Sequence, residues 1–176
     1  GYKRSEGLTV VAIPYVGGDL QFLILLPDAP DGLPALEKKL TGDSLSACAL
    51  LPATSVQLHL PKFKIEPPVM NLGVTLQELG MPSAFNMPRG SANFDGIAEP
   101  GPGQELYISD VLHRAFISVD EQGTEAAAAT VVAMPGFGVP VRKEPVQVWV
   151  NRPFLFAVQH RPSGACLFLG RITDPR

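Results

Sequence analysis

The feature that most constrains this chain is a run of small residues that follows a glycine. Gly123 precedes Thr124, Glu125, four alanines at 126–129 and Thr130. Alanine contributes little to a sheet, and so short a run does not form a stable isolated helix. A strand inserted between two others must bury every second side chain, and only small or β-branched side chains fit there without overpacking. Positions 124, 126, 128, 130 and 132 satisfy this rule, and Gly123 would be the hinge, because a chain reversal needs φ and ψ values that are costly for other residues.

Composition favours one folded domain with short elements. A chain of 176 residues has the length of a single domain. A hydrophobic fraction of 45% with a charged fraction of 18% excludes disorder as a description of the whole. The 17 glycines and 18 prolines interrupt the chain often, which favours strands and turns over long helices. The sequence therefore predicts a mostly β, α+β fold.

Charge and motif patterns exclude several classes of partner. The net charge is -3 and no cluster of lysine and arginine occurs, so we expect no nucleic-acid partner. The longest apolar run, 20–26, is interrupted by Gln21 and stopped by Pro27, far short of the ~20 residues that span a bilayer. Cys48 and Cys166 form no C-x-x-C pair, and the histidines lack zinc-ligand spacing. We expect no membrane partner, no metal and no cofactor.

Alternation and turn residues predict strands along most of the chain. The expected strands are 10–14 and 20–26 as a hairpin, 56–60, 63–65, a long extended segment at 106–119, 146–150, 154–160 and 165–172. Leucines at helical spacing predict short helices at 33–40 and 72–79, the second closed by Gly80, and a further helical turn at 43–50.

One short motif suggests an enzyme. Residues 42–45 read G-D-S-L, as in a class of esterases, and Asp110 with His113 forms a D-x-x-H pattern. A nucleophilic serine needs a free hydroxyl at the end of a buried strand, a base within reach and oxyanion donors. Here the motif follows a charged helix, and no G-x-N-D block is present. Capping of a helix start by Asp43 and Ser44 is the favoured interpretation, and a GDSL-type esterase is the remote alternative.

The histidines are isolated in the sequence. We expect His59 and His160 to be partly exposed strand residues. His113 lies in an otherwise apolar segment, so a hydrogen-bonded core histidine is the favoured interpretation over a catalytic base.

Several segments together resemble one family. Residues 121–130 (E-Q-G-T-E-A-A-A-A-T) resemble the reactive-loop hinge of the serpins, and 148–158 (V-W-V-N-R-P-F-L-F-A-V) resemble the serpin C-terminal signature. Residues 167–172, 58–63 and 110–115 also match. The resemblance covers essentially all of the chain but only the C-terminal part of a serpin. It implies a partial serpin domain over 1–176, with the reactive loop at about 121–144 and without the N-terminal helices and several central strands.

The resemblance also implies a function. Serpins are inhibitors rather than enzymes: the loop is bait for a serine protease, is cleaved and acylated, and then inserts as a new strand, a known case of strand addition that releases stored strain. The chain is therefore expected to be an extracellular serine protease inhibitor acting as a suicide substrate, and inactive as an isolated fragment. The alternative within the family is a non-inhibitory, serpin-like binding protein.

The resemblance assigns residues to this mechanism. Counting from Glu121 along the usual loop length places the scissile bond between Phe137 and Gly138, which implies a chymotrypsin-like or subtilisin-like protease with a large apolar pocket. Met134, or Arg142 with a trypsin-like protease, stays open. The expected hinge residues are Glu121, Gly123, Thr124, Glu125, Ala126, Ala127, Ala128, Ala129 and Thr130.

Two further residues are expected where the central sheet opens. The resemblance implies that Lys62 meets Glu121 near the top of this sheet, and that His113 lies where the strands separate. The alternatives are a solvated charge for Lys62 and a satisfied core histidine for His113.

Overall fold

A computed structural model describes residues 1–97, 101, 106–120 and 144–175. These residues form two compact units, one made of Gly1–Phe63 with Asp120–Arg176 and the other of Lys64–Val119. The fold class is α+β with mostly strands, as predicted. Within the described part of the chain, no helix has the length and apolar character needed to cross a membrane.

The strands are β1 Tyr2–Ser5, β2 Leu8–Pro14, β3 Leu20–Pro27, β4 Val56–His59, β5 Phe63–Ile65, β6 Met70–Asn71, β7 Leu112–His113, β8 Ile117–Val119, β9 Val146–Trp149, β10 Phe154–His160 and β11 Cys166–Ile172. The helices are α1 Leu33–Lys39, α2 Gly42–Ser46 and α3 Gly73–Glu78, with 3-10 turns η1 Ala47–Leu50 and η2 Ser83–Phe85.

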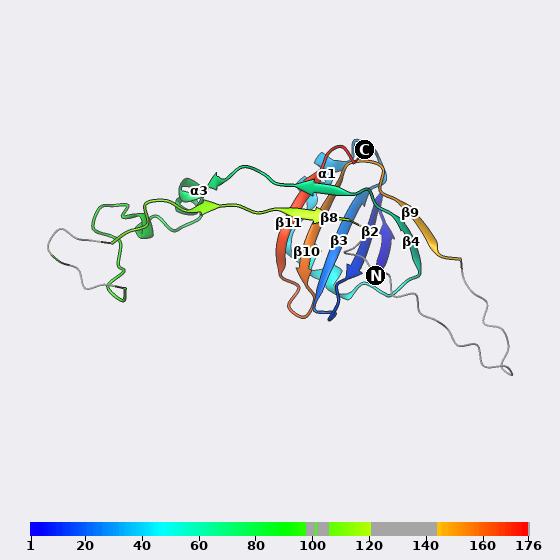
Figure 1. Cartoon of the computed structure of the whole chain (residues 1–176), viewed down its shortest axis with the longest axis horizontal. Coiled ribbons are helices and arrows are strands. Elements are labelled where there is room, and N and C mark those ends of the chain that lie inside the picture. Colours follow the sequence, from blue (N-terminus) through cyan, green and yellow to red (C-terminus); the bar gives the residue numbers. More distant parts are fainter. Residues whose placement is uncertain (98–100, 102–105, 121–143, 176) are drawn as a thin grey trace. The chain divides into compact units, whose positions relative to one another are not determined.

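The largest element is a five-stranded antiparallel sheet with the order β1-β2-β3-β10-β11. Figure 1 shows the blue N-terminal strands beside the orange and red C-terminal ones, so the two ends of the chain share one sheet. Of its three inner strands, β3 and β10 are almost wholly buried. This burial explains why their sequences are apolar at nearly every position instead of alternating.

Both faces of this sheet are packed at its inner strands, whereas the edge strands β1 and β11 are mostly exposed. On one face, Ala12, Leu23 and Ala157 lie in register and form a core with Leu33 of α1 and Leu45 of α2. On the other face, the rings of Phe22 and Phe156 stack with centroids 5.7 Å apart. Phe63 adds an edge contact to Phe154 at 6.1 Å and a tilted one to Phe156 at 5.6 Å.

Two buried glutamines connect β3 and β10 to the helical segment. Gln21 Nε2 donates to Gln159 Oε1 at 2.8 Å and to the carbonyl of Cys48 at 3.0 Å. Gln159 Nε2 donates to the carbonyls of Leu45 at 2.7 Å and Gly164 at 3.0 Å. Because each amide hydrogen has a partner, the pair fixes α2, η1 and the β10–β11 turn against the sheet without an unsatisfied polar atom.

The remaining strands form three pairs. β4 pairs with β9 in parallel, β5 pairs with β8, and β6 pairs with β7 antiparallel. Within the unit Lys64–Val119, α3 begins where Asn71 Oδ1 accepts from Gly73 N at 2.9 Å, and it ends before Gly80, whose φ is +105°. That positive φ is the left-handed conformation that glycine adopts most easily at a helix end.

Most predicted elements are confirmed, including the hairpin, the three helical segments, Gly80 and the C-terminal strands. The extended segment expected at 106–119 is a paired strand only in part. This segment forms only β7, of two residues, and β8, of three. Its exposed Leu112 and Phe116 show why: alternating apolar residues form a strand only where a partner pairs with them.

Candidate functional site

The predicted site centres on the segment between β8 and β9. Residues 121–143 lie outside the described residues, so the hinge residues, Phe137, Gly138 and the alternatives Met134 and Arg142 have no structural description. The structure describes the strands on either side of this segment. β8 ends at Val119 and pairs with β5, whereas β9 begins at Val146 and pairs with β4.

On the N-terminal side of residues 121–143, the chain is held in the β5–β8 pair. Lys62 directly precedes β5, and its side chain is exposed. Because Glu121 lies outside the described residues, its pairing with Lys62 stays a prediction.

His113 is the second residue of β7, and it pairs with Met70 of β6. Its side chain is exposed, so the expectation of a core histidine is wrong for this chain. Nearby, the Asp110 carboxylate accepts a hydrogen bond from Asn71 Nδ2 at 2.7 Å. The role of His113 at an opening of the central sheet stays a prediction.

On the C-terminal side, β9 is fixed to β4 along its whole length. Val148 is buried, whereas Gln147 and Trp149 point outward. The outward side chains meet those of β4: Gln147 Nε2 donates to Gln57 Oε1 at 2.7 Å, and the Trp149 ring stacks on His59 with centroids 3.6 Å apart. Partial burial of His59 agrees with its prediction as a partly exposed strand residue, and the same holds for His160.

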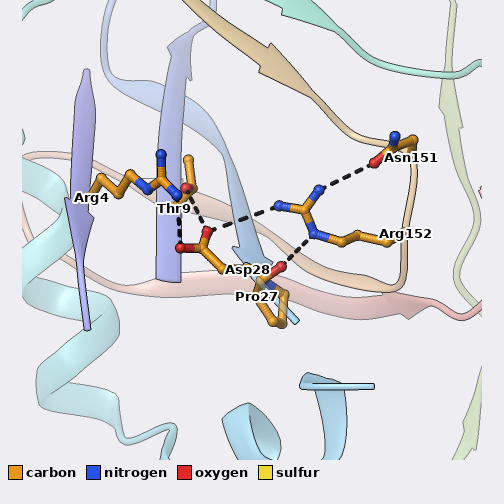
Figure 2. Close-up of polar contacts among 6 residues, drawn as sticks. All are labelled: Arg4, Thr9, Pro27, Asp28, Asn151 and Arg152. Carbon is orange, nitrogen blue, oxygen red and sulfur yellow. Dashed lines mark hydrogen bonds and ion pairs between the residues drawn. The ribbon is translucent and has the colours of Figure 1, made fainter. Parts of the chain in front are cut away.

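Immediately after β9, the turn into β10 is held by a cluster of charged groups (Figure 2). Arg152 Nε donates to the carbonyl of Pro27 at 2.6 Å, and Arg152 Nη2 lies 3.9 Å from the Asp28 carboxylate. Asp28 also accepts from Arg4 at 3.0 Å and from Thr9 at 3.3 Å. Figure 2 shows Asp28 between the two guanidinium groups, so one carboxylate links β1, β2 and the β9–β10 turn.

This cluster shifts the ionisation of its members. The hydrogen bond from Arg4 is the main cause that lowers the pKa of Asp28, and the charges of Arg4 and Arg152 act in the same direction. The same hydrogen bond raises the pKa of Arg4. Asp28 therefore carries its negative charge at neutral pH, and this charge attracts the guanidinium of Arg152 as well as that of Arg4.

The esterase interpretation fails on geometry. Ser44 occupies the third position of α2, where its hydroxyl donates to the Thr41 carbonyl at 2.8 Å and accepts from the Thr41 amide at 3.0 Å. Thr41 Oγ1 accepts from the Ser44 amide at 3.2 Å. This reciprocal pair is a capping box, which confirms that the motif starts a helix, with Thr41 as the N-cap in place of Asp43 or Ser44. The hydroxyl is engaged with backbone rather than with a base.

The comparisons with known proteins agree with this geometry. The family model described as Serpin (serine protease inhibitor) matches residues 1–175. The chain belongs to the serpin family. Serpin B3 of Homo sapiens is 41% identical over 169 residues, which are 94% of this chain and 41% of that protein. Leukocyte elastase inhibitor of Sus scrofa is 36% identical over 183 residues, covering 99% of this chain and 46% of that protein.

Solved structures show the same relationship. The thermophilic serpin tengpin in its native state matches with a TM-score of 0.71 and 34% identity, over 98% of this chain and 43% of that chain. Uncleaved ovalbumin matches with a TM-score of 0.72 and 27% identity, over 98% of this chain and 41% of that chain. The serpin chain described here thus spans less than half the length of these relatives.

The relatives correct one expectation. An extracellular location is wrong, because the matching proteins, Serpin B3, Serpin B10 and leukocyte elastase inhibitor, are clade B serpins, an intracellular group. At the level of the family, protease inhibition and serine protease partners are supported.

Sequence reasoning missed two features of the site, the stack of His59 on Trp149 and the cluster around Asp28. The stack depends on the register of β4 against β9. In the sequence, 86 residues lie between the end of β4 at His59 and the start of β9 at Val146. Parallel pairing of distant strands leaves no local pattern in the sequence. For the cluster around Asp28 the sequence offers only a weak indication: a carboxylate directly follows an apolar strand that ends in proline.

Proposed function

We propose that this serpin chain is part of a single serpin domain that inhibits a serine protease as a suicide substrate. The observation that carries the proposal is the small-residue segment 124–130 in a chain whose family match covers residues 1–175. The strands around the loop are compatible with this role, since β8 and β9 belong to different pairs. A loop between them can join β5 and β8 as a new strand while β9 stays where it is.

The energetic case for insertion is simple. About 14 residues, 124–137, would add a ladder of hydrogen bonds at a net gain of ~0.5–1.5 kcal/mol each. A sum on the order of 10 kcal/mol equals the stability of a typical domain. Pro135 has no amide hydrogen to donate, so the ladder is weaker near its end. We propose that a free energy of this size drives the displacement of the acylated protease.

The bait residue is proposed to be Phe137, with Gly138 on the leaving side. The protease serine attacks the carbonyl of Phe137, an ester forms, and the amine of Gly138 leaves. A phenylalanine fits a large apolar pocket, so a chymotrypsin-like or subtilisin-like protease is the proposed partner. Glu121, Gly123 and the small residues after it form the hinge. Lys62 is proposed to pair with Glu121, and His113 to lie at the opening of the sheet.

Mixing the full-length protein with chymotrypsin tests this proposal. We expect a covalent complex that survives SDS, and loss of that complex in Thr124→Arg, which is still cleaved because a buried arginine stops insertion. Phe137→Ala reduces the reaction with chymotrypsin, whereas Ser163→Ala, an exposed turn residue, leaves it unchanged.

Three outcomes separate the alternatives. Cleavage of the wild type without any complex contradicts inhibition and favours a non-inhibitory serpin. A complex that persists in Phe137→Ala but disappears in Arg142→Ala moves the scissile bond to Arg142. The isolated 176-residue chain is expected to be cleaved without trapping, and a stable complex with it would contradict the need for the rest of the domain.

A further inference from the structure

The outer face of the β4–β9 pair carries a contact that protease inhibition by itself does not explain. Trp149 is 57% exposed, yet its ring lies parallel to that of His59, with an interplanar angle of 5° and a centroid distance of 3.6 Å. An exposed tryptophan that made no contact would have no single orientation. The stack therefore orders a large side chain on an otherwise open surface.

The pairing of the two strands explains why these residues meet. β4 and β9 run parallel with His59 opposite Trp149 and Gln57 opposite Gln147. On this face, Gln147 contacts two side chains of β4. Its amide nitrogen donates to Gln57, and its Oε1 lies 3.4 Å from Nε2 of the His59 imidazole. The backbone makes the last bond of the pair at the same place, where Val150 N donates to the His59 carbonyl at 2.9 Å. His59 thus holds the end of β9 through both its ring and its main chain.

The stack of His59 on Trp149 lies directly after the proposed reactive loop in the chain. β9 begins at Val146, and the proposed reactive loop covers about 121–144. In the described part of the chain, β9 pairs with β4 and with no further strand. A strand of four residues with one partner has few backbone hydrogen bonds, so side-chain contacts determine how firmly it stays in place.

We propose that His59 and Trp149 are positioning residues that clamp β9 to β4 and thereby fix the C-terminal end of the reactive loop. The proposal rests on the proposed function of the loop. With the clamp in place, the residues after the scissile bond have a fixed anchor when the protease binds. Without it, β9 separates from β4 more often, and fewer encounters present the loop in a cleavable form.

The clamp has a direct spectroscopic test. Trp149 is the only tryptophan of the 176-residue chain, and the emission of Trp149→Phe supplies the background to subtract in the full-length protein. The stacked imidazole of His59 shields one face of the Trp149 indole from water, and indole emission moves to longer wavelength as its contact with water increases. We expect the difference emission of His59→Ser to have its maximum at longer wavelength than that of the wild type, and that of His59→Phe to stay close to the wild type.

The positioning role is tested by exchange and by inhibition. His59→Ser removes the ring, whereas His59→Phe keeps an aromatic surface of similar size. We expect faster hydrogen exchange of the Val150 amide in His59→Ser and near wild-type exchange in His59→Phe. The rate of inhibition of chymotrypsin should fall about two- to tenfold in His59→Ser, the range that an aromatic pair supports, and recover in His59→Phe.

Each result decides one question. An emission maximum that is the same in the wild type and in His59→Ser would show that the two rings are not stacked. A stack with unchanged exchange and unchanged inhibition in His59→Ser overturns the positioning role. If the wild type forms no complex with any serine protease, the proposed function fails, while the exchange of Val150 still decides whether His59 clamps β9. Circular dichroism of both variants verifies that they fold.

Discussion

The five-stranded sheet and the unit Lys64–Val119 are both rich in apolar residues, but they differ in strand length and in how far these residues are buried. In the sheet, the inner strands β2, β3 and β10, of seven or eight residues, are mostly buried on both faces, and Leu23, Ile24 and Phe154 have no exposed surface. In the other unit, the strands have two or three residues, and large apolar side chains such as Val74 and Leu79 are 68% and 76% exposed.

The difference shows that partners, rather than hydrophobicity, make a strand. Leu20–Pro27 is a strand because β2 and β10 pair with it on both sides. Residues 106–119 are similarly apolar, but only β7 and β8 find partners in the described part of the chain. We therefore expect substitutions to be costly in the sheet and cheap in the other unit, and matched pairs of variants test this contrast.

The largest contrast is expected for leucine truncation. Leu23→Ala removes a side chain with 0% exposure that contacts both neighbouring strands and the helices above them, so a loss of about 2–5 kcal/mol in the free energy of unfolding follows from the cavity. Leu79→Ala, at 76% exposure, should change it by less than about 0.5 kcal/mol. Urea unfolding of both variants measures the difference, and equal losses would contradict the contrast.

The second contrast concerns buried polar groups. Gln159→Leu leaves the Leu45 and Gly164 carbonyls and the Gln21 amide without this partner, and each buried group left unsatisfied costs about 1–3 kcal/mol. Asn71→Ala loses an exposed hydrogen bond to Asp110, which water replaces, and one part-buried bond from the Gly73 amide. We expect Gln159→Leu to unfold at clearly lower urea, and a smaller effect than that of Asn71→Ala would refute the structural role of the glutamine pair.

The sequence predicts those parts of the fold that local pattern determines. Gly17 and Gly18 both have positive φ and mark the hairpin turn, and Gly80 ends α3 as expected. The short polar side chains of Asp43 and Ser44 predict a helix start at this point, although the N-cap is Thr41. Local chemistry of this kind needs no knowledge of distant residues.

The rest depends on contacts between distant residues. β1 was missed because Tyr2–Ser5 is polar and mostly exposed, and it is a strand only through its pairing with β2. His113 was placed in the core because its neighbours are apolar, although Leu112 beside it is 68% exposed. The stack of His59 on Trp149 and the cluster around Asp28 follow from register and from turns that meet in space, which a single sequence does not specify.

A third contrast comes from two glycines. A Cβ added at Gly170 would lie 2.3 Å from Cζ of Phe156, so Gly170→Ala forces the ring to move within a packed sheet and should cost about 1–3 kcal/mol. Gly96 in the other unit has nothing within 4 Å of an added Cβ and no positive φ. Gly96→Ala should therefore be neutral or slightly stabilising in thermal unfolding. A neutral Gly170→Ala would indicate that the face of the sheet around Phe156 is loosely packed.

The smallest effect is expected from Asp28, and it depends on pH. Arg4 lowers the pKa of this carboxyl below its ordinary value of 3.8, so the unfolded chain binds the proton more readily than the folded one. The stability that Asp28 contributes is therefore fully present above the unfolded pKa, and is lost as the pH falls through the lower, folded pKa.

Asp28→Asn should be less stable than the wild type at pH 7, and the difference should shrink below about pH 4. Arg4→Ala should make stability less dependent on pH in the same way, because the hydrogen bond from Arg4 is the main cause of the lowered pKa. Urea unfolding at pH 7 and pH 3 measures both differences, and a gap between wild type and Asp28→Asn that grows toward acid would show that Asp28 is not paired as the structure has it.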